Sequence, residues 1–236
     1  MTDMLECDGS VDIDYNAVQY NSLDERCPDM MQFKALPITR RRLIAAIPVI
    51  LLGAASSAKA ADAIGEAFDV RGEVLAHQSE DVRNLGNGAD VLLSDLVETR
   101  EASFARLDLS GGTTVHLGSQ ARLLIDQFIA DAGGVLELGE GALLLDRAEE
   151  LPKIDLTIRS RFGLIAVRGT RFFAGPSRGV FGVFVERGVV EVQAAGVSRH
   201  LEAGQGVNIP AAGEPPGEVT SWGKARIDEA LVSVGL

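Results

Sequence analysis

Cysteine is nearly absent from this chain. The two cysteines, Cys7 and Cys27, lie close to the N-terminus, and none follows residue 60. Without a thiol, the larger part of the chain can have no nucleophilic cysteine and no thiolate metal site, and it can form no disulfide. Its stability must come from a hydrophobic core, which 236 residues with 46% apolar side chains are long enough to build.

Positive charge is also in short supply. The chain has 22 basic and 34 acidic residues, and 16 basic and 26 acidic residues follow residue 60, a formal charge of −10 for that part. Phosphate backbones repel a protein of this charge, so nucleic acid is excluded as the expected partner. The acidity is explained by solubility.

Long apolar runs are missing except near the N-terminus. Arg40, Arg41 and Arg42 precede an apolar run over residues 43–52, and Ala58-Lys59-Ala60 has the small-x-small pattern of a cleavage site. This predicts a signal peptide over residues 39–60, cleaved before Ala61, and a periplasmic or secreted protein. The paired arginines also resemble a twin-arginine signal, so both export routes stay open.

Two alternatives concern the N-terminal residues. An uncleaved segment would be a membrane anchor, and the chain would then contact the membrane through it alone, although Pro48 interrupts the run and a span needs about 20 apolar residues. Residues 1–38 have no periodic apolar pattern, so they are a disordered leader or reflect an incorrectly assigned start, with Met30 or Met31 the true one.

Residues 61–209 predict an all-β domain, because short apolar runs alternate with glycine, asparagine, aspartate and serine. We expect antiparallel sheets packed as a sandwich or a solenoid-like stack. Besides the hairpin described next, strands are predicted over residues 71–76, 121–126, 135–138, 142–146, 154–158, 164–167, 171–174, 180–185, 189–193 and 206–209.

The clearest hairpin begins at Ala105. Ala105, Leu107 and Leu109 alternate with polar residues, Gly111-Gly112 allow a tight reversal, and Val115 and Leu117 repeat the inward parity. Thr114 and His116 are expected to point outward.

The chain changes character after residue 209. Residues 210–217 are rich in proline and glycine and predict an irregular linker. Residues 221–232 predict a short helix capped by Ser221, with Trp222, Ala225, Leu231 and Val232 on an apolar face. This tail is expected to pack back on the sheet, with a docking peptide for a partner as the alternative.

Six short motifs, taken together and in order, resemble the FecR domain. The resemblance covers about residues 67–209, and its most specific elements are the Arg-Gly-Thr-x-Phe and Glu-x-Gly-x-Val patterns. The motifs are Gly72-Glu73-Val74, Asp95-Leu96-Val97-Glu98-Thr99, Ala105-x-Leu107-x-Leu109, Val167-Arg168-Gly169-Thr170-x-Phe172, Val185-Glu186-Arg187-Gly188-Val189-Val190 and Leu201-x-Ala203-Gly204-Gln205.

The resemblance implies a role in signalling. In well-known members this domain lies in the periplasm of an iron-transport regulator and relays a signal from an outer-membrane receptor to a cytoplasmic sigma factor. Those members carry a cytoplasmic helical domain before a single span, whereas only 38 residues without an amphipathic helical pattern precede the predicted signal peptide here. We therefore expect a stand-alone exported member, with a membrane-anchored regulator as the alternative.

Two sets of residues are candidates for special roles. Gly112, Gly169, Gly188 and Gly204 are expected to be structural turn glycines. Five arginines within twenty residues without an acid form a candidate face for an anionic glycan, a peptidoglycan carboxylate or an acidic envelope protein: Arg159, Arg161, Arg168, Arg171 and Arg178. The alternative is that they pair with acids of neighbouring strands, such as Glu137, Glu140 or Asp155.

Catalytic patterns are missing. The histidines at 77, 116 and 200 have no metal-ligand spacing, and no serine stands in a nucleophile elbow. No cofactor is predicted. The sequence therefore predicts a non-enzymatic binding or sensory module of the bacterial envelope, with a glycan-acting enzyme as a remote alternative.

Overall fold

Most of the described chain is built from short strands, as the alternating pattern of its residues predicts. The structure is a computed structural model and describes residues 63–236. The predicted leader, signal peptide, cleavage site and both cysteines lie outside the described residues. Within them, the expected all-β class is confirmed: two nine-stranded sheets are followed by one short helix.

The first sheet, sheet A, carries the C-terminal helix. Its strands, in spatial order, are β18 (Thr220–Ser221), β17 (Gln205–Ile209), β14 (Val180–Arg187), β13 (Arg171–Ser177), β10 (Leu143–Arg147), β7 (Thr113–Leu117), β6 (Phe104–Leu109), β1 (Ala63–Arg71) and β4 (Asp90–Leu92).

The second sheet, sheet B, packs against sheet A. Its spatial order is β16 (Val197–Glu202), β15 (Val189–Ala194), β12 (Gly163–Arg168), β11 (Asp155–Ser160), β9 (Gly133–Glu140), β8 (Arg122–Ile129), β5 (Leu96–Thr99), β2 (Val74–Gln78) and β3 (Asp81–Asn84). Strands β9 and β11 run parallel, which makes this sheet mixed.

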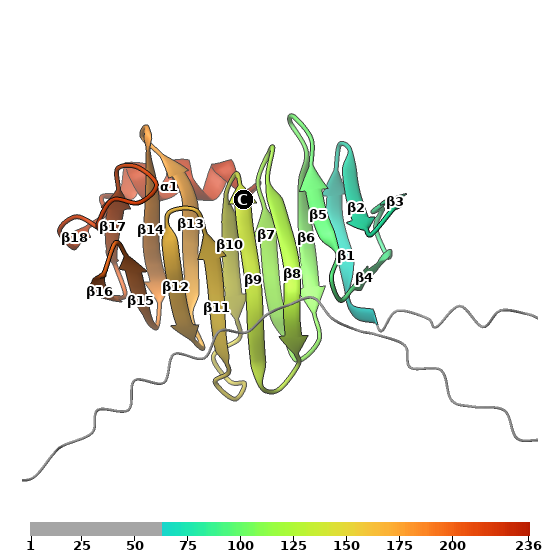
Figure 1. The fold of residues 1–236 in the computed structure, drawn as a ribbon, viewed down its shortest axis with the longest axis horizontal. Helices are drawn as coiled ribbons and strands as arrows, with labels where there is room; N and C mark the ends of the chain where they lie inside the picture. Colours follow the sequence, from blue (N-terminus) through green and yellow to red (C-terminus); the bar gives the residue numbers. More distant parts are fainter. Residues whose placement is uncertain (1–62) are drawn as a thin grey trace, which may run out of the picture. The chain divides into compact units, whose positions relative to one another are not determined.

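The chain moves steadily from one end of the molecule to the other while it switches between the sheets. From β6 onward it places β6 and β7 in sheet A, β8 and β9 in sheet B, β10 in sheet A, β11 and β12 in sheet B, and so on to β17. Figure 1 shows this advance as a change of colour along the long axis. The fold therefore combines both expected features: it is a sandwich, and it is stacked like a solenoid.

The core lies between the two sheets and follows the period-two pattern of the strands. In β6 and β7, Ala105, Leu107, Leu109, Val115 and Leu117 are buried, and the residues between them are half-buried on the outer side, as predicted. Burying a leucine side chain contributes about 1.5–3 kcal/mol. Repeated along both sheets, this alternation provides one continuous core.

The predicted turn glycines lie between strands and have positive φ angles. The values are +77° at Gly112, +63° at Gly169, +89° at Gly188 and +83° at Gly204. Gly112 belongs to the turn between β6 and β7, whereas the other three lie where the chain leaves one sheet for the other.

One predicted strand, over residues 71–76, is wrong as a single element. Gly72 has a φ of +78°, and the chain crosses there from β1 in sheet A to β2 in sheet B. A Cβ at Gly72 would overlap Ser103, so glycine is required at this crossing for space as well as for φ. The sequence also missed β1, β3, β4, β5, β16 and β18 as strands.

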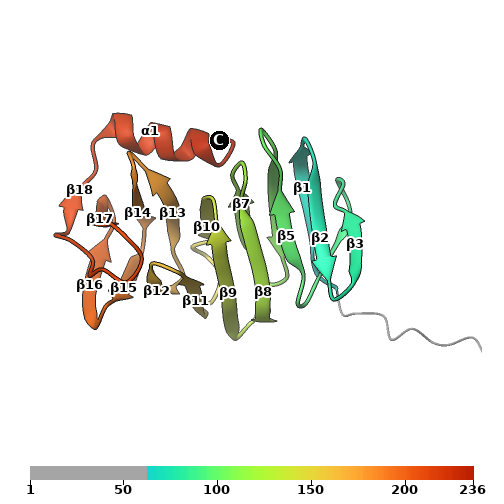
Figure 2. The same ribbon diagram turned by 45° about the horizontal axis from the view of Figure 1, so that its top comes forward.

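The C-terminal tail packs on the outer face of sheet A, as expected. Helix α1 spans Lys224–Ser233, and Figure 2 shows it running across the strands. The predicted cap is wrong: Gly223 precedes the helix without a side-chain cap, and Ser221 pairs with Gln205 as part of β18. In the part of the chain that the structure describes, no helix is both long and apolar enough to cross a membrane.

The apolar face of the tail also differs from the prediction. Trp222, Ala230 and Val234 are buried, whereas Val232 is 65% exposed and Ala225 is exposed as well. The inward positions are Ile227, Ala230, Leu231 and Val234, which follow the i, i+3, i+4, i+7 spacing of one helix face. The buried tail residues form a second small core with residues of β10, β13 and β14 on the outer side of sheet A.

Trp222 is the anchor of this second core. Its ring stacks on Phe184 with centroids 5.2 Å apart, and the Arg226 guanidinium lies 3.6 Å from the centroid on the ring. The ring rests directly on backbone, because a Cβ at Gly206 would overlap the indole nitrogen and one at Gly182 would come within 2.8 Å of the ring. Two glycines on adjacent strands thus provide the slot that Trp222 occupies.

The crossing at Gly188 gives a stability prediction. Gly188→Val is expected to lower the free energy of unfolding by about 2–4 kcal/mol, because it combines an unfavourable φ with a clash. A Cβ there would lie 2.7 Å from Thr170 Cγ2. Gly196→Val is the matched control, since φ is +76° but a Cβ would meet nothing within 4 Å. Equal losses of the two variants in chemical denaturation would show that the clash with Thr170 adds nothing to the cost of the unfavourable φ.

The Trp222 slot gives a second prediction. Gly206→Ala is expected to displace the ring, expose it to water and lower stability by about 1–3 kcal/mol, as overpacking does. The chain has a single tryptophan, so its fluorescence reports this contact alone, and the emission should shift to longer wavelength. Gly223→Ala, with open space around its Cβ, is the control and should leave the emission unchanged. An unshifted spectrum for Gly206→Ala would mean that the slot is not tight.

Candidate functional site

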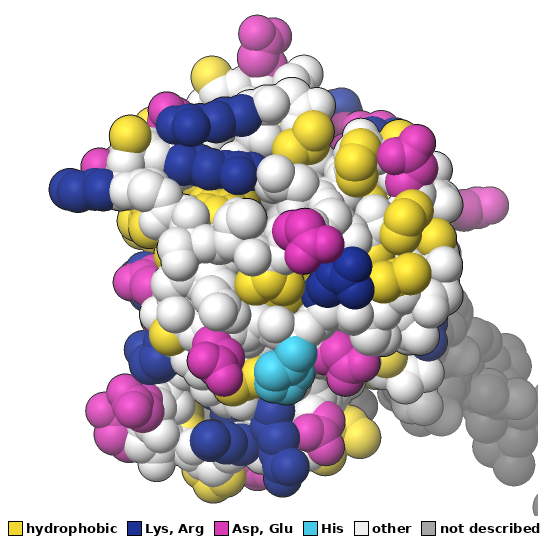
Figure 3. All heavy atoms as spheres, turned by 90° about the vertical axis from the view of Figure 1, so that its left-hand side faces the viewer, with side chains coloured by type: hydrophobic (Ala, Val, Ile, Leu, Met, Phe, Trp, Pro, Cys, Tyr) yellow, Lys and Arg dark blue, Asp and Glu magenta, His cyan; other side chains and the backbone are white. Residues whose placement is uncertain are grey.

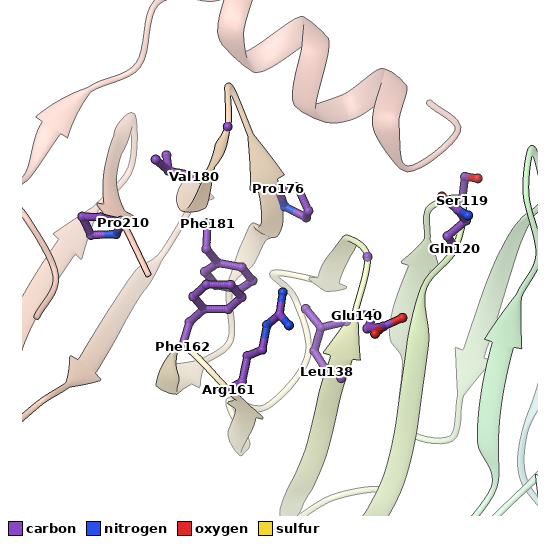
Figure 4. A pocket seen from close by; sticks show the side chains of 13 residues that line it. Ser119, Gln120, Leu138, Glu140, Arg161, Phe162, Pro176, Val180, Phe181 and Pro210 are labelled. Atoms are coloured by element: carbon purple, nitrogen blue, oxygen red, sulfur yellow. The ribbon is translucent and has the colours of Figure 1, made fainter. Parts of the chain in front are cut away.

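An open groove lies at one edge of the sandwich, among the turns that join the strands, where hairpins of unequal reach meet. The β11–β12 hairpin turns back at Arg161 and Phe162, while the β13–β14 hairpin extends further (Figures 1 and 4). The space left between them has a volume of about 540 Å³. It is lined by Ser119, Gln120, Leu138, Gly139, Glu140, Gly141, Arg161, Phe162, Pro176, Gly179, Val180, Phe181 and Pro210.

The apolar side of the groove is built around two stacked rings. Phe162 and Phe181 lie with centroids 4.3 Å apart and planes 13° from parallel. Phe181 is nearly buried and belongs to β14, whereas Phe162 belongs to the turn and is only half-buried. The stack therefore joins the two sheets and leaves part of one ring accessible from the groove.

Two charges of opposite sign line the same groove. The Arg161 guanidinium lies 4.9 Å from the centroid of Phe162, which holds it over the aromatic ring. Figure 4 shows Arg161 rising beside the stacked rings, with Glu140 on the other side of Leu138. Within residues 63–236, neither Arg161 nor Glu140 takes part in an ion pair or a side-chain hydrogen bond. Both charges are thus available to a bound molecule.

The five arginines singled out in the sequence do not form a common face. Arg159 and Arg168 lie on the outer side of sheet B, Arg171 lies in sheet A, and Arg161 and Arg178 lie in turns. Arg161 follows the end of β11 at Ser160, so it does not continue the outward row of side chains to which Arg159 belongs. At the C-terminal end of the stack, basic and acidic side chains are interspersed over the surface (Figure 3).

Four of the five have acidic neighbours. Arg159 Nη1 lies 3.6 Å from Asp126 Oδ2, and Arg168 Nε lies 3.5 Å from Asp155 Oδ1. Asp155 is one of the acids expected from the sequence. Arg178 donates two hydrogen bonds of 2.9 Å to Glu229 and so joins the β13–β14 turn to α1. These bonds raise the pKa of Arg178 and lower that of Glu229. Such exposed pairs contribute little to stability.

Arg171 belongs to a denser network on the outer face of sheet A. It donates to Asp146 and Glu186, and Arg187 donates to Asp146 and to the carbonyl of Arg147. Burial alone would lower the pKa of Arg171, but the two carboxylates raise it. This network links β10, β13 and β14, so Arg171 is engaged in structure and is not free for a ligand.

Arg147 is an important residue that the sequence did not indicate. It is 1% exposed, and its guanidinium donates to the carbonyls of Pro152 and Gly111 and to the Thr113 hydroxyl. A buried arginine needs such acceptors because unpaired charge is costly inside a protein. Arg147 thereby ties the loop after β10 to the β6–β7 turn.

The remaining titratable groups of the described residues do not gather into a metal-binding arrangement. Among residues 63–236, no group of three or more histidine, cysteine, aspartate or glutamate side chains could hold a metal ion. Half-buried His116 was expected to point outward. It lies on the outer face of sheet A, where burial and, secondarily, the nearby Arg171 and Arg106 lower its pKa.

Comparison with known proteins agrees with the resemblance in the sequence. Residues 95–191 match the family model described as FecR protein. This confirms the FecR resemblance over a narrower range than residues 67–209. The match begins at β5 and ends in β15, while the same two sheets continue on both sides of it.

Two solved structures are similar in part. Both are described as a candidate anti-sigma factor from Parabacteroides distasonis ATCC 8503, at 1.65 Å and 2.50 Å resolution. Each is 19% identical, covers 58% of this chain and has a TM-score of 0.48. The chain spans 64% and 63% of their respective lengths. No curated protein matches the chain.

The pKa of His116 gives a pH prediction. The folded state binds a proton on His116 less readily than the unfolded state does, so the neutral imidazole is the form that favours folding. The full contribution of His116 to stability is therefore present above the pKa that this group has in the unfolded state. That contribution is lost as pH falls through the lower folded-state pKa. An NMR titration should place the midpoint below that of a free histidine, and His116→Gln should reduce the loss of stability between neutral and mildly acidic pH. A midpoint above the free value would contradict the assigned environment.

Proposed function

The chain carries a FecR domain at residues 95–191, and on this premise we propose that it is a regulatory module of the bacterial envelope that acts by binding. The match to the FecR family carries the proposal. We propose that the protein is exported to the periplasm or secreted, that it needs no cofactor, and that it performs no catalysis of its own.

The groove supports the binding part of this proposal. Pockets that bind ligands are typically concave and mostly apolar, with a few polar groups that fix orientation. The groove beside Phe162 and Phe181 combines apolar side chains with a few polar and charged ones, and it is lined by segments of both sheets. A preformed site of this kind loses little conformational entropy on binding. We propose that it recognises an envelope protein or a component of the peptidoglycan.

The acidic character of the chain supports the same proposal indirectly. A formal charge of −12 opposes binding to nucleic acid. Within the described residues, most arginines that the sequence offered as a face for anions are paired with acids. Recognition is therefore assigned to the groove and its Arg161 side chain.

Export is tested on the protein from cells of its native host. N-terminal sequencing of the exported protein should return Ala61 as the first residue, because the proposed signal peptide ends at Ala60. A protein that keeps Arg40 and stays in the membrane fraction would contradict cleavage and favour the anchored regulator. A protein found in the cytoplasm would contradict export altogether.

Binding is tested with the exported protein on isolated cell envelopes. Arg161→Ala is expected to lower the amount bound by about tenfold at low salt, because it removes the unpaired guanidinium of the groove. Arg159→Ala, on the neighbouring strand and outside the groove, is the matched control and should bind like the unchanged protein. Equal binding of both variants would contradict the assignment of the groove.

A further inference from the structure

The two unpaired charges of the groove indicate which kind of molecule fits it. We propose that the groove binds a short peptide in its zwitterionic form. The free carboxylate of the peptide pairs with Arg161, its free ammonium pairs with Glu140, and an apolar side chain of the peptide packs against the stacked phenylalanines. This inference rests on the proposed function, because it names the ligand class for the same site.

The carboxylate partner follows from the geometry of Arg161. Its guanidinium lies over the Phe162 ring at 4.9 Å from the centroid, and in the described chain it donates to no side chain or backbone group. The N–H groups of this exposed side chain make no hydrogen bond within residues 63–236. They match a carboxylate, which accepts two parallel hydrogen bonds from arginine.

The ammonium partner follows from Glu140. This residue ends β9, next to the crossing at Gly141, and its carboxylate has no ion pair or hydrogen bond in residues 63–236. Leu138 separates it from Arg161 in the close view, and the two side chains do not form a salt bridge with each other. A ligand with both charges can therefore reach each of them without displacing an existing pair.

The apolar part of the ligand has its own surface. Phe162, Val180, Pro176 and Pro210 give the groove accessible apolar surface beside the two charges, whereas Phe181 and Leu138 are buried beneath it. Proline and phenylalanine side chains give up no ion pair or hydrogen bond when an apolar group covers them. A volume of about 540 Å³ lies within the range of small-ligand sites and suits a peptide of very few residues.

Opposite charges in one groove also discriminate against other ligands. A purely anionic glycan would pair with Arg161 but would bring negative charge towards Glu140, and like charges facing each other lower affinity. A cationic peptide would meet the reverse problem at Arg161. The zwitterion is the charge pattern that satisfies both groups.

The experiment measures the affinity of the exported protein for the dipeptide Ala-Phe by calorimetry. Four forms are compared: free, N-acetylated, C-amidated and blocked at both ends. The free form should bind best, and each block should weaken binding about tenfold, as expected when one charge-assisted hydrogen-bonded pair is lost. Arg161→Gln should bind the free and the amidated forms equally, and Glu140→Gln should bind the free and the acetylated forms equally.

Two further variants make the test specific. Arg159→Gln, on the same hairpin but outside the groove, should keep the full preference for the free form. The double variant Arg161→Glu with Glu140→Arg should regain affinity for the free form, because it restores one charge of each sign. Thermal melts of all variants should stay close to that of the unchanged protein, since neither groove charge has an ion pair or a side-chain hydrogen bond within residues 63–236.

Several results would overturn the inference. It fails if all four forms bind alike, if none binds at about 1 mM, or if both groove variants keep the original preference. It also fails if glycan strands without peptide compete for the site, or if Arg161→Gln changes the oligomeric state, which would make a second copy the occupant. If these tests fail while Arg161→Ala still lowers envelope binding, the proposed function stands and the peptide inference alone is wrong.

Discussion

The architecture depends on one constraint: each strand must direct every second side chain into the space between the two sheets. Because alternate residues of a strand face opposite sides, a chain that crosses from one sheet to the other must reset its direction without shifting that alternation. The crossings at Gly72 and Gly188 do this through positive φ angles in places where a side chain would collide with a neighbouring strand or loop. The core is continuous because these crossings are short and tightly packed.

The groove and the tail are consequences of the same arrangement. Each hairpin stacks on the next, so a hairpin that ends early, such as the one at Arg161, leaves a hollow between longer neighbours. The outer face of a sheet stays open unless another element covers it, and Trp222 fills one such opening with the help of bare backbone at Gly182 and Gly206. The groove thus lies among the turns, and the C-terminal tail covers part of an outer face, while the inner faces of the two sheets form the core.

Local patterns predicted the elements that depend on neighbouring residues. The hairpin from Ala105 to Leu117 was predicted with the correct inward residues, because its alternation and its glycine pair are contained in one segment. Strand β3, over residues 81–84, has one apolar residue in four, so its sequence shows no strand pattern. It forms because it pairs with β2. Helix α1 was predicted, but its start was misplaced because Ser221 pairs in a sheet instead of capping the helix.

The candidate site was less accessible to sequence reasoning. Arg161 was selected as one of five arginines in a stretch without acids, and its actual setting depends on Phe162, Phe181 and Glu140, which come from three different strands or turns. Arg147 gave no signal, because its partner Gly111 lies 36 residues away. Contacts of this kind follow from the order in which hairpins stack, which a single sequence does not specify.

The steady advance of the chain along the molecule has a thermodynamic consequence. In an array where each layer touches only its neighbours, stability is approximately a sum of layer and interface contributions, and opening can begin at either end. The layers around β10 and β11 have neighbours on both sides, while β3, β4 and β16 lie at the margins. Amide protons should therefore exchange most slowly in the middle of the array and progressively faster towards its two ends.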